Sequence, residues 1–117
     1  MAIVNRQITT ATLDIFDPVS SLGVPVGKSY AITNILVCNT GAAAATFDMH
    51  LIPNGDPRDD KVTQVINGLT LPAGETFTFD SERIVLEAGD AIVFHQAVPD
   101  IGAGLTDLAA TVSYLEV

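Results

Sequence analysis

Hydrophobic and polar residues alternate along much of the chain, in short runs separated by glycine and proline. In residues 44–52, Phe47, Met49 and Leu51 alternate with polar residues. Successive side chains of a strand point to opposite faces, so this pattern predicts a half-buried strand. Glycine or proline recurs about every ten residues, a turn spacing typical of an all-β sandwich or barrel.

Residues 29–39 form the strongest single strand prediction. One face is predicted to carry Tyr30, Ile32, Leu36 and Cys38. The opposite face carries Ile35 and Val37. Apolar residues on both faces indicate a central strand that is covered on both sides.

The remaining segments favour further strands over helices. They cover residues 4–16 (as one long or two short strands), 61–66, 75–80, 83–86, 91–96 and 107–117. Asn67 and Gly68 provide turn chemistry. The alanine run at 42–45 is the only helix-like stretch, and we interpret it as the beginning of a strand, since alanine propensity is a weak preference.

The predicted fold class is all-β: an antiparallel β-sandwich, jelly-roll-like, with about seven to nine strands and little or no helix. Residues 1–117 fit one domain. The predicted core includes Ile32, Leu36, Phe47, Met49, Leu51, Phe77, Phe79, Leu86, Val93 and Val112.

Composition supports a folded domain, because 48% of the residues are hydrophobic and 16% are charged. The net charge is −9, and the five basic residues, Arg6, Lys28, Arg58, Lys61 and Arg83, are scattered. Such a surface repels phosphate, so we expect neither nucleic acid nor an anionic membrane surface as a partner. No apolar run is long enough for a membrane helix, and the first residues do not resemble a secretory signal.

Cys38 is the only cysteine, so it has no intrachain disulfide partner and no cysteine metal cage around it. Its apolar neighbours predict a buried structural thiol. A chain of this kind is compatible with a reducing cytoplasm.

Residues 71–75 and 86–95 resemble the second half of a cupin, in which a Gly-Asp turn precedes a strand ending in a metal-binding histidine. Such a site needs about four converging ligands. The chain has only two histidines, and the alternation places His50 on the outer face. We therefore interpret Gly89 and Asp90 as a hairpin turn and His95 as a strand-end residue.

The acidic loop at 54–60 contains Asp56, Asp59 and Asp60, which are weak calcium candidates. The loop does not match the spacing of an EF-hand, so a solvated acidic turn is the favoured interpretation. No serine lies in a nucleophile elbow, and no glycine-rich loop precedes a helix. The sequence predicts no catalytic residue, no metal, no cofactor and no enzymatic activity.

Four segments together resemble small β-sandwich structural proteins of tailed bacteriophages, especially marine ones. They are VPVGKSYAITNILVCN at 24–39, LPAGETFTF at 71–79, IVLEAGDAI at 84–92 and ATVSYLE at 110–116. The resemblance covers residues 20–117. It implies a non-catalytic virion component, assembled in the host cytoplasm, that acts as a homo-oligomer with other virion proteins such as the major capsid or tail proteins. It leaves open head decoration, neck and tail.

Residues 1–16 are a candidate assembly arm, in which Ile3, Val4, Ile8 and Thr10 would add a strand to a neighbouring copy. The alternative is that this segment pairs within its own sheet. Two other functions remain open: a carbohydrate- or cell-surface-binding module such as a fibre head, and a small cupin-like metal enzyme.

Overall fold

In a computed structural model of the chain, residues 2–8, 13–16, 23–56, 61–80, 84–96 and 108–117 are described. They form nine β-strands: β1 (Ala2–Ile8), β2 (Leu13–Asp14), β3 (Tyr30–Asn39), β4 (Ala45–Ile52), β5 (Gln64–Leu71), β6 (Thr76–Phe79), β7 (Ile84–Leu86), β8 (Ala91–His95) and β9 (Leu108–Glu116). None of these residues belongs to a helix that is long and apolar enough to span a membrane. The predicted all-β class is confirmed.

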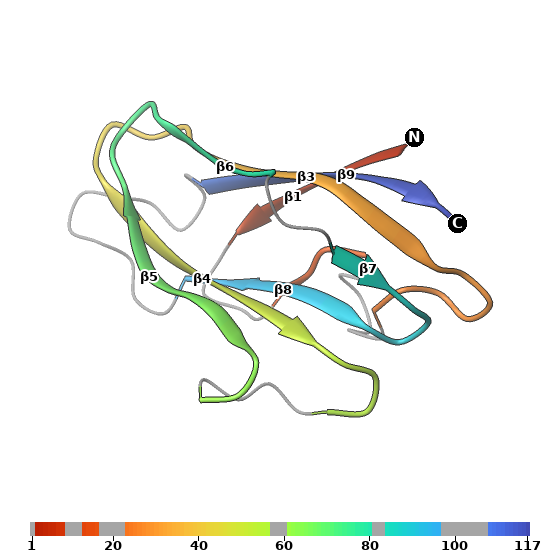
Figure 1. The fold of residues 1–117 in the computed structure, drawn as a ribbon. Helices are drawn as coiled ribbons and strands as arrows, with labels where there is room; N and C mark the ends of the chain where they lie inside the picture. Colours follow the sequence, from red (N-terminus) through yellow and green to blue (C-terminus); the bar gives the residue numbers. More distant parts are fainter. Residues whose placement is uncertain (1, 9–12, 17–22, 57–60, 81–83, 97–107) are drawn as a thin grey trace.

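The strands form two antiparallel sheets that pack face to face (Figure 1). Sheet A has the order β1-β9-β3-β6, with β7 paired to the first part of β3. Sheet B has the order β2-β8-β4-β5. β6 and β7 pair with successive parts of the same edge of β3, so together they occupy one strand position in sheet A. The paired strands are nested along the chain: β4 pairs with β5, β3 with β6 and β7, β2 with β8, and β1 with β9. A long hairpin wound in this way is a jelly roll.

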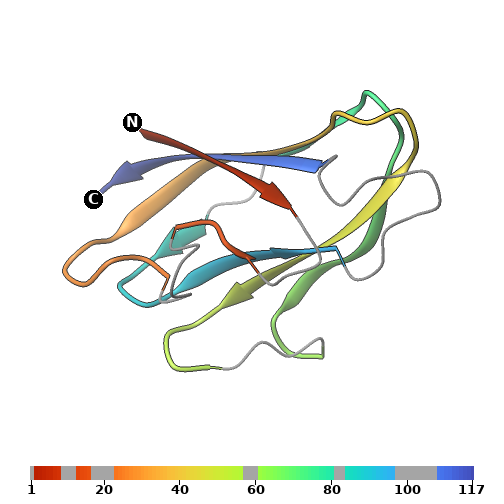
Figure 2. The same cartoon turned by 180° about the vertical axis from the view of Figure 1, so that it is seen from behind.

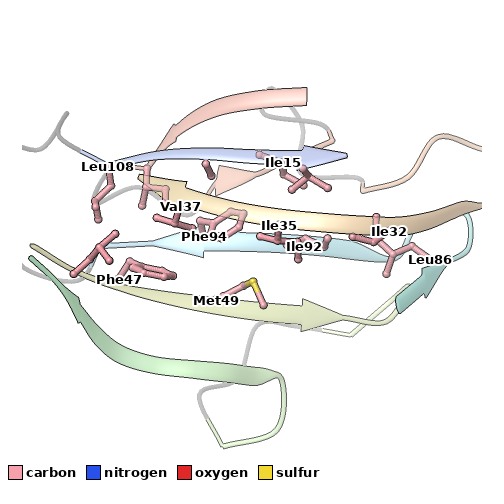
Figure 3. Packing of buried hydrophobic residues seen from close by; sticks show 14 of the residues in the cluster. Ile15, Ile32, Ile35, Val37, Phe47, Met49, Leu86, Ile92, Phe94 and Leu108 are labelled. Atoms are coloured by element: carbon pink, nitrogen blue, oxygen red, sulfur yellow. The ribbon is translucent and has the colours of Figure 1, made fainter. Parts of the chain in front are cut away.

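The core lies between the two sheets, where aliphatic and aromatic side chains from both layers point toward each other (Figure 3). Of the predicted core, Ile32, Phe47, Met49, Leu86 and Val112 belong to the buried cluster. Leu51, Phe77 and Phe79 are partly buried against it. Val93 is buried but lies outside this cluster, on the other face of sheet B from Phe94.

Leu36 does not belong to the core, and a β-bulge in β3 is the reason. The pairing of β3 with β9 shifts register between Ile32 and Asn34. Tyr30 and Ile32 face the core before the shift, and Ile35 and Val37 face it afterwards. One extra residue in a strand exchanges its two faces, so an uninterrupted alternation places Leu36 on the wrong side.

A second correction concerns Asn67 and Gly68, which lie inside β5 and not in a turn between strands. The register of β5 on β4 shifts beside these residues, between Phe47 and Met49. Gly68 has a φ of 59°, and its N–H donates to Asp48 Oδ1 at 2.6 Å. The left-handed glycine therefore makes a bulge that the opposite strand stabilises through a carboxylate.

The N-terminal segment forms two strands in different sheets, with β1 at an edge of sheet A and β2 at an edge of sheet B. All seven residues of β1 pair with β9 of the same chain. Of the two alternatives for this segment, pairing within its own sheet is the one observed for Ala2–Ile8.

Candidate functional site

The outer face of sheet A is assembled from five strands. The pairing register aligns Asn5, Thr111, Leu36 and Thr78 in one row across β1, β9, β3 and β6. The other side chains on this face are Ile3, Gln7, Ala31, Thr33, Asn34, Cys38, Thr76, Val85, Ala109, Ser113 and Leu115. We call this set the A face. No described segment lies over it in either view (Figures 1 and 2).

None of the side chains in the A face is charged, although the chain carries a net charge of −9. Large apolar side chains are exposed at three places on it: Ile3 at 66%, Val85 at 63% and Leu115 at 40%. Single exposed aliphatic residues are common, but a whole uncharged sheet face is typical of interaction surfaces.

Two pairs of polar side chains on the A face are hydrogen-bonded to each other. Thr33 Oγ1 and Ser113 Oγ lie 2.7 Å apart, between β3 and β9. The Thr111 hydroxyl donates to Asn5 Oδ1 at 2.8 Å, between β9 and β1. Because these groups are hydrogen-bonded to each other, covering them with another surface leaves fewer donors unsatisfied.

Charged side chains lie around this face. Glu75 directly precedes β6 and Asp80 directly follows it, and both are exposed. At the far end of the sheet, Lys28 Nζ lies 3.0 Å from Glu116 Oε1. The hydrogen bond to Glu116 raises the pKa of Lys28 above its ordinary value, and the attraction between the two charges adds to this.

The four predicted assembly residues lie in different environments. Ile3 is exposed on the A face, whereas Ile8 is fully buried in the core and Val4 packs against it. Thr10 lies outside the described residues. Of these three residues, Ile3 is therefore the one whose side chain is accessible to another molecule, since Val4 and Ile8 stabilise the chain's own core.

Cys38 is only partly buried, which corrects the prediction of a buried thiol. The bulge in β3 is again the cause, because it places Cys38 with Leu36 on the A face and not in the core. The thiol lies opposite Ala109 and Thr76.

The two histidines lie on the outer side of sheet B. His95 ends β8, as predicted, and its Nδ1 is 3.7 Å from Asp48 Oδ2. His50 has the predicted facing but is fully buried, with Nδ1 2.9 Å from Thr63 Oγ1. The segment before β5 covers it, because the Leu51 N–H donates to the Thr63 carbonyl at 3.0 Å. Within the described ranges, no three metal-ligating side chains form a group that could hold a metal ion.

The acidic candidates are only partly within the described residues. Asp56 is exposed, and its N–H donates to the Pro53 carbonyl in a turn, whereas Asp59 and Asp60 lie outside the described ranges. Asp90 has a structural role: its carboxylate accepts from the Asn54 and Glu87 N–H groups at 2.8 and 2.9 Å. These bonds, with the one from Asp90 N–H to the Glu87 carbonyl, confirm a tight turn. The prediction that this turn forms a hairpin is wrong, because β7 pairs with β3 in sheet A whereas β8 pairs with β2 and β4 in sheet B.

A cavity of about 320 Å³ lies between the end of β4 and β7. Leu51, Ile52, Ile84 and Leu86 are among the residues that line it. Among the described residues that line it, Asp90 is the only ionisable one, and its carboxylate oxygens already accept two main-chain hydrogen bonds. Specific ligand sites combine apolar walls with several converging polar groups, and the described lining lacks that combination.

Comparisons with known proteins add no family assignment, since no family model and no curated protein matches the chain.

Proposed function

We propose that this protein is a non-catalytic structural component of a tailed-bacteriophage particle, on which it assembles with copies of itself. The observation that carries the proposal is the A face, whose described side chains carry no charge although the chain has a net charge of −9. A free monomer with this charge has ample acidic residues to distribute over its surface. Their exclusion from one face favours a surface that is covered by protein.

The fold is compatible with this proposal but does not select it. Jelly rolls occur in viral capsid proteins, lectins and cupins, which correspond to the three functions that the sequence left open. The sequence motifs at 24–39, 71–79, 84–92 and 110–116 provide the link to phage proteins. The A face supports assembly over sugar binding, because neutral aliphatic and hydroxyl side chains on a sheet pack well against another protein surface.

The test is binding of the purified full-length chain to purified heads and tails of tailed phages that infect the same host. Co-sedimentation with heads at a fixed copy number per particle supports a head decoration role, and co-sedimentation with tails supports a tail role. An otherwise identical chain with Ile3→Lys, at the exposed end of the A face, should bind more weakly. If the chain binds neither heads nor tails, the proposal is wrong.

A further inference from the structure

We propose that the A face is the interface at which two copies of this chain pack sheet against sheet around a two-fold axis. This inference rests on the proposed assembly function and names the partner for that surface: a second copy of the same chain.

Charge is the first argument. Two copies that each carry −9 repel one another wherever their acidic surfaces meet. Contact through the A face requires no charged group to leave water, and it keeps Glu75, Asp80 and Glu116 at the rim of the interface. A basic partner would instead be attracted to the acidic loops, so the neutral face fits a neutral partner surface, which the same face of another copy provides.

Surface chemistry is the second argument. Ile3, Val85 and Leu115 supply apolar area from β1, β7 and β9. The hydroxyl pairs Thr33 with Ser113 and Thr111 with Asn5 are satisfied inside one copy. Burial of the face therefore gains apolar contact without requiring an accurate set of hydrogen bonds across the interface.

Size is the third argument. β9 has nine residues, so the face is about 30 Å long at about 3.4 Å per residue. Four strands about 4.8 Å apart give a width of about 19 Å, and the area is on the order of 600 Å² per copy. Two copies then bury on the order of 1,200 Å², which is the lower end of the range for specific protein interfaces.

An edge contact through β1 is a poorer solution. Arg6 alternates with Asn5 and Gln7, and it pairs with Ala110 on the core side of the sheet. A charged side chain that points inward from an edge strand discourages a further strand from pairing there.

Thr111 lies between Asn5 and Leu36, in the interior of the face, so a two-fold axis near Thr111 places the two copies of this residue close together.

The experiment compares charge substitutions at matched strand positions by analytical ultracentrifugation. Thr111→Glu and Ala109→Glu place a carboxylate on the A face. Val65→Glu adds the same charge at a 49% exposed position on β5, in the other sheet. We expect the wild type and Val65→Glu to form dimers or larger assemblies. Both A-face variants should dissociate, with dimer affinity on the order of a hundredfold weaker, because burying an unpaired charge is unfavourable.

Circular dichroism melting of each variant reports whether it folds, and Ala109→Glu, at an exposed position, is the safer substitution. Wild-type association that survives both A-face substitutions overturns the inference, and so does equal dissociation of Val65→Glu. A monomeric wild type that binds phage heads or tails overturns the inference and leaves the proposed function intact. If the chain forms dimers through the A face but binds neither heads nor tails, the inferred interface is supported and the proposed phage role is contradicted.

Discussion

The side-chain amide of Asn39, at the end of β3, donates a hydrogen bond of 2.9 Å to the main-chain carbonyl of Leu71, at the end of β5. The same amide donates to the Ala43 carbonyl at 2.8 Å, and its oxygen accepts from the Gly41 N–H at 2.9 Å. Asn39 is fully buried. One polar side chain therefore joins sheet A to sheet B where the chain passes from β3 to β4.

The first prediction follows from this contact. Asn39→Ala removes three hydrogen bonds and leaves a buried carbonyl without its donor, so we expect a loss of about 2–4 kcal/mol in the free energy of unfolding. Urea denaturation followed by fluorescence or circular dichroism measures it. Asn67→Ala, at an exposed position in β5, is the control and should change stability by less than about 0.5 kcal/mol. Equal effects of the two substitutions would contradict the bridging role of Asn39.

The second prediction concerns two glycines with similar backbone conformations. Gly23 has a φ of 75° and Gly27 a φ of 81°. A Cβ at Gly23 would overlap the Asp90 carbonyl oxygen, which accepts a hydrogen bond from Val24 N–H, whereas nothing lies near a Cβ at Gly27. We expect Gly27→Ala to cost about 1 kcal/mol from backbone strain alone.

Gly23→Ala should cost about 3 kcal/mol or more, since the main-chain bonds between residues 23–24 and 89–90 must also shift. Thermal unfolding of both variants under identical conditions gives the comparison. Similar melting temperatures for the two would show that the close approach to Asp90 is not present in the protein.

The third prediction tests the bulge in β3. Ile35 is fully buried, whereas Leu36 is partly exposed on the A face. Ile35→Ala should therefore cost about 2–5 kcal/mol, and Leu36→Ala less than half as much. The measurement is urea unfolding at low protein concentration, so that association of copies does not contribute. A larger loss for Leu36→Ala would mean that the alternation continues without interruption from Tyr30 to Cys38.

The fourth prediction is a pH dependence that involves Tyr30. Burial raises the pKa of the Tyr30 hydroxyl above its ordinary value of 10.0, and the neighbouring Tyr114 raises it further. Below that ordinary value both folded and unfolded states keep the proton. As the pH rises above it, the unfolded chain loses its proton first, so the folded state loses stability until its own raised pKa is passed.

Tyr30→Phe removes this contribution while keeping an aromatic ring against Phe16 and Tyr114. The difference in stability between wild type and variant should stay constant at neutral pH and shift in favour of the variant above about pH 10. Urea unfolding at a series of pH values measures this difference. Parallel stability curves across the alkaline range would contradict the prediction.

Local sequence was sufficient to predict several elements and part of the candidate site. The alternation around Phe47 and Met49 marked β4, and the turn at Gly89 and Asp90 separated β7 from β8. Ile3, which the sequence suggested as an assembly residue, is exposed on the A face, and its role in a contact stays a prediction. These features depend on the spacing of neighbouring residues, which the sequence records directly.

Burial of His50 could not be predicted in the same way. The alternation gave its facing, but its exposure depends on Thr63, which reaches it from the segment before β5. The bulges beside Asn34 and Gly68 are similar cases. A bulge is a property of two paired strands, and one extra residue reverses the faces of everything that follows.

By itself, the sequence determined that this chain is an all-β domain with a large excess of acidic residues, because strand periodicity, turn residues and net charge are properties of local composition. Only the tertiary structure decided that β1, β9, β3 and β6 are neighbours. These strands come from both ends and the middle of the chain. Their outer residues combine into one uncharged face only after long-range pairing sets which strands are adjacent and in which register.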